Sequence, residues 1–387
     1  AQITIHVPEN GALNVFDGSQ VDAGKYPINI KANTINFEST AGSFTSTNEI
    51  TIVPATVGNN ISVGTATGDG LDISQTTFNK MQAPNLVIGG AGYTGTITVE
   101  NLNSTNSGQL TLIANGTGGA IDISGGLDLQ GQDSSGISLY VKGSGATTDL
   151  SGPITTAGAA FFDDAVRLVG DTDIVTSGGD VTITGGTEGI YSAEVLPAGT
   201  GYNLSINSGS GNIIVGNETG FGNNNGTDAL VNDLSLSSST STKIGSGSQS
   251  IGGEMAVPGG PLTLMGDTLL GGRSLVTPAG VDGAGHNLDL GFTEQTTIDG
   301  NFTNINNLKS SYSVALEGGI TTSGYQEYNA SAVLVGNTTL QGTDLTFSNG
   351  LGGNGNNLDL NFSNTTFLND NFANIADLTS EGDVSLS

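Results

Sequence analysis

Two segments of the chain have nearly the same sequence: LMGDTLLGGRSL, which runs from Leu264 to Leu275, and LVGNTTLQGTDL, which runs from Leu334 to Leu345. They align without a gap when position 264 is placed on position 334. The same shift carries HNLDLGF (His286–Phe292) onto NNLDLNF (Asn356–Phe362). Ungapped register over this length indicates an internal repeat.

A more distant copy of the repeat lies in the first half of the chain. GPITTAGAAFFDDAVRLVGDT (Gly152–Thr172) matches GGITTSGYQEYNASAVLVGNT (Gly318–Thr338) without a gap. The two blocks share an I-T-T-x-G element, an aromatic residue, a leucine and a closing G-[DN]-T element in the same order. The repeat therefore extends well beyond its two best copies.

Apolar and polar residues alternate in short segments along the whole chain. An alternation of period two predicts a strand with one face buried and one exposed. Gly, Asn, Asp or Ser follow each segment within a few residues, and these residues favour turns. The pattern predicts strands of about three to five residues. In the repeat it places Leu288 and Leu358 inward, and Asp289 and Asp359 outward. Further examples are Ile3–Ile5, Ile97–Val99, Leu110–Leu112, Leu127–Leu129 and Val181–Ile183.

The composition excludes several classes of protein. The 387 residues include 62 Gly, no Cys, no Trp and 2 His, and 8 Lys+Arg stand against 36 Asp+Glu, for a net charge of -28. Without Cys there is no disulfide framework and no thiolate metal site. The acidic excess disfavours nucleic-acid binding. No apolar run approaches the roughly 20 residues that a membrane-spanning helix needs.

The period of the repeat and its short strands together predict the architecture. Helical periodicity is nearly absent, and Thr76–Met81 and Asn301–Leu308 could each hold at most one helical turn. A repeat of about 70 residues does not suit propeller blades, whose period is about 40 to 50 residues. It suits a coil with turns of roughly 20 residues, in which each strand pairs with the strands one turn above and below. We therefore expect an all-β protein, a parallel β-solenoid that forms a single elongated rod.

No composition break or linker divides the chain. We expect residues 1–387 to form one continuous solenoid, with repeat units at approximately 152–190, 244–316 and 318–387 and more degenerate coils over 1–151. Asn and Thr stacked at the turns are expected to add side-chain hydrogen bonds along the stack.

Two motifs resemble the repeats of filamentous-haemagglutinin-type exoproteins, which bacteria export by two-partner secretion. One is the segment Ala55–Val99, with a short polar turn before an L-x-I-G-x-x-x-x-G-x-I-x-V strand pair. The other is the I-T-T-x-G, G-[DN]-T-x-L and G-x-N-L-x-L unit of the repeat. The resemblance implies a right-handed parallel β-helix, a surface adhesin, an extracellular or bacterial cell-surface location, and partners among cell-surface or matrix components.

The chain also departs from that family. The NPNG-like motif of the family's secretion domain has no counterpart, since no Asn-Pro pair occurs. The chain opens directly on a predicted strand, Ile3–Ile5, and stops within a repeat. These features predict either a fragment of a longer shaft or a mature subunit that associates with other copies at its solenoid ends.

Carboxylates are the main candidates for catalysis, because some β-helical proteins act on polysaccharides. Asp163 and Asp164 form the one adjacent aspartate pair, whereas Glu254, Glu294 and Glu317 stand alone. A carboxylate pair could cleave a glycosidic bond if suitably spaced. In the aligned repeat, however, the pair becomes Asn329-Ala330, which favours a turn over an active site. We predict no catalytic residues.

Neither histidines nor glycine-rich segments indicate a cofactor or metal site. His286 aligns with Asn356 and is expected in a solvated turn, and His6 has no partner in the sequence. Gly352–Asn357 resembles the start of a nonapeptide calcium repeat, but it occurs once and Asp359 breaks the pattern. We predict no cofactor and only adventitious Ca²⁺. The eight basic residues are spread singly, so no basic patch is expected.

The sequence thus predicts a non-enzymatic extracellular structural shaft of a large bacterial surface adhesin or exoprotein. The absence of Cys fits passage of an unfolded chain through an export pore. The alternatives are a subunit of a self-assembling extracellular filament of a biofilm matrix and, as a distant third, a β-helical polysaccharide-active enzyme.

Overall fold

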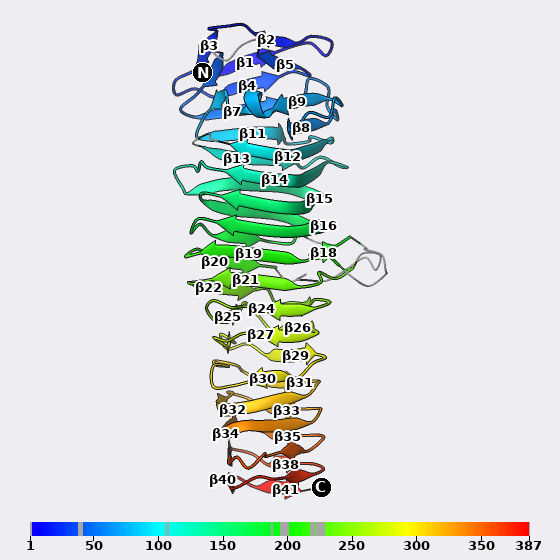
Figure 1. Ribbon diagram of the computed structural model, residues 1–387, viewed down its shortest axis with the longest axis vertical. Coiled ribbons are helices and arrows are strands. Elements are labelled where there is room, and N and C mark those ends of the chain that lie inside the picture. The colour runs from blue at the N-terminus through cyan, green and yellow to red at the C-terminus, as the bar shows by residue number, and fades with distance from the viewer. Residues whose placement is uncertain are drawn as a thin grey trace. The chain divides into compact units, whose positions relative to one another are not determined.

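The computed structural model describes residues 2–37, 42–104, 106, 108–186, 189–193, 201–216, 221 and 229–386. Over these residues the chain consists almost entirely of strands that run parallel to their neighbours, with one short helix (Figure 1). Each turn of the chain lays its strands against those of the turn before it. The predicted fold class, an all-β parallel β-solenoid, is confirmed.

Contacts divide the chain into two compact units. The first comprises Ala1–Ala193 and Tyr202–Ile214, and the second comprises Glu194–Gly201 and Val215–Ser387. The predicted strands were about three to five residues long. Many of the observed strands have this length, but several are longer because they continue around a corner from one face to the next.

Strands of the first unit form three main stacks. The first stack contains β1 (Ile3–His6), β4 (Ile28–Lys31), β7 (Glu49–Val53), β11 (Asn85–Gly90), β13 (Gln109–Ala114), the beginnings of β15 (Ile137–Thr156) and β16 (Ala159–Thr176), β17 (Val181–Ile183) and β20 (Asn212–Val215). The second contains β9 (Leu71–Ser74), β8 (Ile61–Gly64), the beginnings of β12 (Thr96–Ser104) and β14 (Ala120–Leu129), the middles of β15 and β16, and β18 (Ile190–Ser192). The third contains the ends of β12, β14, β15 and β16, and β19 (Leu204–Gly209). Smaller pairings join β2 (Leu13–Val15) to β5 (Ile35–Phe37), and β3 (Gln20–Asp22) to β6 (Ser43–Thr45) and β10 (Met81–Gln82).

Turns of the first unit differ in length. Ile28 pairs with Ile50, whereas Ile50 pairs with Leu86, so the second of these two turns is much the longer. The longer turn accommodates β9 and the helix α1 (Gln75–Phe78), which Ser74 caps by accepting a hydrogen bond from the backbone N–H of Thr77. Two segments were expected to hold at most one helical turn each. Thr76–Met81 overlaps this helix, whereas Asn301–Leu308 contains no helical turn.

The second unit is more regular, and from β31 onward each complete turn supplies three successive faces. Its first stack contains β23 (Gly247–Ser250), β26 (Thr268–Gly272), β29 (Leu288–Phe292), β31 (Leu308–Ser310), β33 (Gln326–Tyr328), β35 (Leu345–Phe347), β38 (Thr366–Leu368) and β41 (Val384–Leu386). The second contains β30 (Thr296–Ile298), the beginnings of β32 (Val314–Thr321) and β34 (Ala332–Gly342), β36 (Leu351–Gly352) and β39 (Phe372–Ala373). The third contains the ends of β32 and β34, β37 (Leu358–Phe362) and β40 (Leu378–Ser380). Before these turns, β21 (Leu234–Ser238), β24 (Glu254–Ala256) and β27 (Ser274–Val276) stack, as do β22 (Ser241–Ile244), β25 (Leu262–Leu264) and β28 (Val281–Asp282).

The sequence repeat is out of phase with these turns. Leu288 pairs with Leu308, and Leu308 pairs with Gln326, which makes the second of these turns slightly shorter than the first. The shift between the two best copies of the repeat is not a whole number of such turns. Leu288 therefore lies in the first stack, but its repeat mate Leu358 lies in β37 of the third stack. One sequence unit can occupy different faces because each face requires the same pattern, a short strand with apolar residues pointing inward.

Inward and outward positions follow the predicted alternation. Leu288 and Leu358 are each about 1% exposed, so both lie in the core. Asp289 and Asp359 follow them on the outer side of the strand and are half-buried. The inward side chains of successive turns stack on one another and form the core of each unit.

One ring of an aromatic pair in the core of the second unit has a hydroxyl that is hydrogen-bonded to a buried glutamine. Tyr328 is completely buried, and its ring stacks on Phe347 with the ring centroids 5.0 Å apart. Its hydroxyl donates to Oε1 of Gln326 at 2.9 Å. In the aligned block of the first unit these two positions are Phe162 and Ala160. The hydroxyl and its acceptor thus appear together and are absent together, because a buried hydroxyl needs a partner.

The G-[DN]-T element of the repeat forms the same corner in both units. In each of three copies the Thr hydroxyl donates to the carbonyl of the Gly two residues before it, at 2.7 to 3.1 Å. The Asp or Asn between them accepts a backbone N–H from the next turn at 2.9 to 3.0 Å. The copies are Gly170–Thr172, Gly266–Thr268 and Gly336–Thr338. These contacts confirm that turn residues add side-chain hydrogen bonds along the stack.

Replacing Leu288 by Asp should lower the stability of the second unit by about 4 kcal/mol or more, because it buries a charge without a partner. Replacing Asp359 by Ser should change it by no more than about 1 kcal/mol, because the hydrogen bond that it accepts from Thr379 is exposed and the one from Asn361 is long, at 3.5 Å. Urea unfolding followed by circular dichroism measures both. Equal unfolding midpoints for the two variants would contradict the assignment of the inner face.

Replacing Asp171 by Ala should cost about 0.5 to 1.5 kcal/mol, because the backbone N–H of Asn203 loses its acceptor from the neighbouring turn. The matched control is Asp171→Asn, which keeps an acceptor oxygen and copies the residue found at Asn337. Thermal unfolding of the variants compares them. If Asp171→Asn is as unstable as Asp171→Ala, charge rather than hydrogen bonding holds the corner.

Candidate functional site

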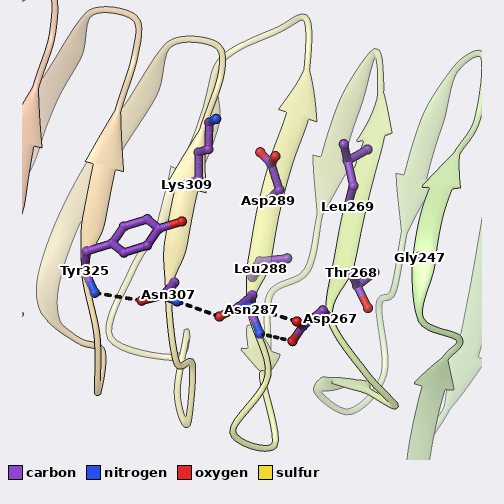
Figure 2. A pocket seen from close by; sticks show the side chains of 10 residues that line it. All are labelled: Gly247, Asp267, Thr268, Leu269, Asn287, Leu288, Asp289, Asn307, Lys309 and Tyr325. Carbon is purple, nitrogen blue, oxygen red and sulfur yellow. Dashed lines mark hydrogen bonds between the residues drawn. The ribbon is translucent and has the colours of Figure 1, made fainter.

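A shallow pocket of about 310 Å³ lies on the outer side of the first stack of the second unit (Figure 2). It crosses several successive turns, from β23 to the start of β33. Most of its wall consists of residues that alternate with the core residues of those strands, and the buried Thr268 and Leu288 also line it. The lining residues are Gly247, Asp267, Thr268, Leu269, Asn287, Leu288, Asp289, Asn307, Lys309 and Tyr325.

A chain of hydrogen bonds forms one side of the pocket, as Figure 2 shows. Asn287 donates its backbone N–H and its Nδ2 to the carboxylate of Asp267, at 2.9 and 2.8 Å. Asn307 donates from Nδ2 to Oδ1 of Asn287 at 2.8 Å, and accepts the backbone N–H of Tyr325 at 2.9 Å. Each residue stands one turn further along the stack. This side of the pocket is therefore fixed by bonds between turns.

Asp289 on the opposite side has an unsatisfied acceptor. Its Oδ1 is buried and has no hydrogen-bond partner. Burial raises the pKa of the Asp289 carboxyl above its ordinary 3.8, the Lys309 ammonium opposes this shift in pKa, and the Glu327 carboxylate adds to it. The Asp289 side chain nevertheless lines the pocket and is only half-buried, and a carboxylate can accept a hydrogen bond from a ligand.

Lys309 and Tyr325 complete the pocket. Lys309 pairs in register with Asp289 on the neighbouring strand, and both side chains extend from the same side of the strands (Figure 2). No ion pair within 4.0 Å joins Lys309 to a carboxylate in the described part of the chain. The Tyr325 side chain, 40% exposed, stands one strand further on. The pocket thus offers an acceptor, a cation with several donors and an accessible aromatic ring.

The Asp267 carboxylate of the pocket is already bonded to Asn287. Asp289 and Lys309 are therefore the charged groups of the pocket that could bind a ligand. Over the residues that the structure describes, no group of three or more His, Asp or Glu side chains could hold a metal ion. Within the same residues, no helix is long and apolar enough to cross a membrane.

The Asp163-Asp164 pair does not lie in a turn, and that prediction was wrong. Both residues are inside β16, at a corner where the register with β15 shifts between the pairs Lys142–Asp163 and Thr147–Ala165. Because neighbouring residues of a strand point to opposite sides, Asp163 is half-buried whereas Asp164 is only 3% exposed. Asp164 accepts hydrogen bonds from the Thr148 hydroxyl and from the backbone N–H of Ala165. The structure does not bring the two carboxylates to a common surface.

The isolated glutamates lie apart. Glu254 accepts a hydrogen bond from Ser274 at 3.4 Å, and Glu294 lies 3.4 Å from the guanidinium of Arg273. Glu317 is exposed on β32. None of the three lines the pocket of Figure 2.

The histidines and the glycine-rich segment also occupy separate places. His6 is exposed on β1, and Nδ1 of His286 lies 3.9 Å from Asp267. In Gly352–Asn357, the side-chain amides of Asn354 and Asn356 both donate to the backbone carbonyl of Leu334 in the turn before. These amides stabilise the stack and are not directed at a common ligand.

A second charged column lies in the first unit. Arg167 donates from Nε to Oδ1 of Asp149 at 2.8 Å, across neighbouring strands. Asp122 stacks on the other side of Asp149, and its burial, reinforced by the Asp149 charge, raises the pKa of Asp122. This column is an ion pair between Arg167 and Asp149, with a second carboxylate, that of Asp122, beside it.

Sequence analysis did not find the pocket. Its residues occupy equivalent places in successive strand segments: Asn287-Leu288-Asp289, Asn307-Leu308-Lys309 and Tyr325-Gln326-Glu327. A signal was present, because residues at one place in successive turns stack side by side. This signal can be used only when the length of each turn is known. The turn from Leu288 to Leu308 and the turn from Leu308 to Gln326 differ in length. The sequence repeat is also not a whole number of turns.

Replacing Asp289 by Asn should stabilise the protein at neutral pH. The folded state holds the Asp289 proton more tightly than the unfolded state, because the folded pKa is raised above 3.8. The stability that this group contributes is therefore present below the unfolded pKa and lost as the pH rises through the folded pKa. The gain from Asn should be largest above that window and disappear below it. Unfolding midpoints across the pH range measure the gain, and a pH-independent difference would contradict this account.

Comparison of the chain with protein-family models, with curated proteins and with solved structures finds no match.

Proposed function

We propose that the chain is a non-enzymatic structural shaft of a large bacterial surface adhesin or exoprotein of the filamentous-haemagglutinin type, located outside the cell. Such a shaft would hold another part of the protein away from the cell surface. Its partners would be cell-surface or matrix components.

The observation that carries the proposal is the way in which each turn is bonded to the next. Parallel ladders, stacked core residues and the G-[DN]-T corners all connect a turn to its immediate neighbours. Structures held by such nearest-neighbour contacts can be extended by repetition, and each folded turn provides a template for the next. A protein whose task is to span distance benefits from this property more than one built around a single site.

The composition supports the same proposal. A net charge of -28 disfavours association between long molecules in solution. The absence of Cys suits a chain that crosses a membrane unfolded, because a premature disulfide would block its passage. The right-handed coil implied by the family resemblance belongs to this proposal.

Negative-stain electron microscopy of the purified protein should show isolated rods of uniform length. Globular particles would contradict the shaft, and open-ended fibres would favour the alternative, a subunit of an extracellular filament. Protease treatment of intact cells that express the full gene product tests the location. Survival of the protein in intact cells, together with its digestion after lysis, would contradict a position outside the cell.

Screening for cleavage of neutral and acidic polysaccharides tests the enzymatic alternative. We expect no activity. Activity that is lost when Asp163 and Asp164 are replaced by Ala, in a variant with an unchanged melting temperature, would overturn the non-enzymatic proposal.

A further inference from the structure

We propose that the pocket formed by Asp289, Lys309 and Tyr325 binds a neutral hexose unit of a polysaccharide, with the sugar stacked on the Tyr325 ring and one of its hydroxyls bonded between Asp289 and Lys309. This inference concerns a binding site and does not depend on the structural role proposed above.

Tyr325 supplies a surface for the apolar face of a sugar ring. Its side chain is 40% exposed and lines the pocket. The backbone on either side is fixed, because the N–H of Tyr325 donates to Asn307 and its carbonyl accepts the N–H of Leu308. An aromatic ring on a fixed backbone offers a large contact area at low entropic cost.

Asp289 and Lys309 together select a hydroxyl. The half-buried Asp289 carboxylate lines the pocket and can accept a hydrogen bond. Lys309 presents donors from the neighbouring strand, about 4.8 Å away at the backbone. A hydroxyl can donate to a carboxylate and accept from an ammonium at the same time, which neither a carboxylate ligand nor an ammonium ligand can do.

The charge around the pocket favours a neutral sugar over an acidic one. Asp267 and Asp289 line it, and Glu327 stands in register beside Lys309. Three carboxylates surround one ammonium, so an acidic sugar would meet net repulsion. The pocket extends across successive turns and is shallow, which suits a unit within a polymer that lies along the stack.

A larger hollow of the same unit lacks these features. It has a volume of about 800 Å³ and is lined mainly by Gly, Thr and Ser residues beside Asp282, Phe302 and Asn304. Asp282 is already bonded to the backbone N–H of Ala284 and to the amide of Asn304, each at 3.0 Å, and Phe302 is buried. The smaller pocket is the one with an accessible ring and charged groups that could bind a ligand.

Isothermal titration of the full chain with cellohexaose, maltohexaose and β-1,4-mannohexaose tests the proposal, with tetragalacturonate as the acidic comparison. At least one neutral oligomer should bind with a dissociation constant below about 1 mM. Tyr325→Ala should weaken that binding about tenfold or more, and Tyr325→Phe should retain it. Asp289→Asn should weaken it as well, because the amide cannot replace a charged acceptor.

Tyr312→Ala is the matched control. Tyr312 is a similarly exposed tyrosine, 44% against 40%, but it does not line the pocket. Its replacement should leave binding unchanged, and all variants should keep the melting temperature of the parent to within a few degrees. No binding by any neutral oligomer, stronger binding of tetragalacturonate, or equal loss with Tyr312→Ala and Tyr325→Ala would overturn the proposal. Rods in the electron microscope without sugar binding would refute this site alone and leave the shaft intact.

Discussion

Parallel hydrogen bonding between strands of successive turns is the constraint on which the rest of each unit depends. A strand in such a ladder can satisfy its backbone groups only if the next turn returns to the same position with the same register. This requirement determines which residues stack. Leu288 and Leu308 meet in the core, while Asp289 and Lys309 meet outside, because one register governs both. Core packing and surface chemistry are therefore consequences of one ladder.

The corners explain how turns of unequal length keep this register. A corner of the G-[DN]-T type bonds its Thr to its own Gly and its Asp or Asn to the backbone of the next turn. In two copies the Thr hydroxyl also lies 3.2 to 3.3 Å from a carbonyl of the preceding turn, so a corner reaches no further than one turn in either direction. Residues can therefore be inserted elsewhere, as in the turn that contains β9 and α1, without disturbing the ladder. For the same reason, one copy of the sequence repeat can place Leu288 in the first stack while the next copy places Leu358 in the third.

Outward columns are where such a protein can vary, because the ladder constrains only the inward ones. The column Asp289, Lys309 and Glu327 carries charges of alternating sign, and the column beside it carries Asn287, Asn307 and Tyr325. Neither column is needed to close the core. A pocket arises where the two columns leave space between them, and its chemistry depends on which residues successive turns bring together.

The sequence alone determined the fold class and the orientation of side chains. Alternation of period two has one physical meaning in a strand, so Leu288 and Leu358 could be assigned to the core and Asp289 and Asp359 to the surface. The exclusion of long helices followed from the absence of a helical period.

Only the tertiary structure decided which turns are neighbours. Asp163 and Asp164 looked like a turn because their repeat mates are Asn329 and Ala330, yet both lie inside β16, at a shift in its register with β15, and one of the two is buried. The pocket of Asp289, Lys309 and Tyr325 was likewise invisible, since these residues come together only through the length of each individual turn. Local patterning fixes which way a side chain points, whereas its neighbours are set by turn lengths that the chain adjusts during packing.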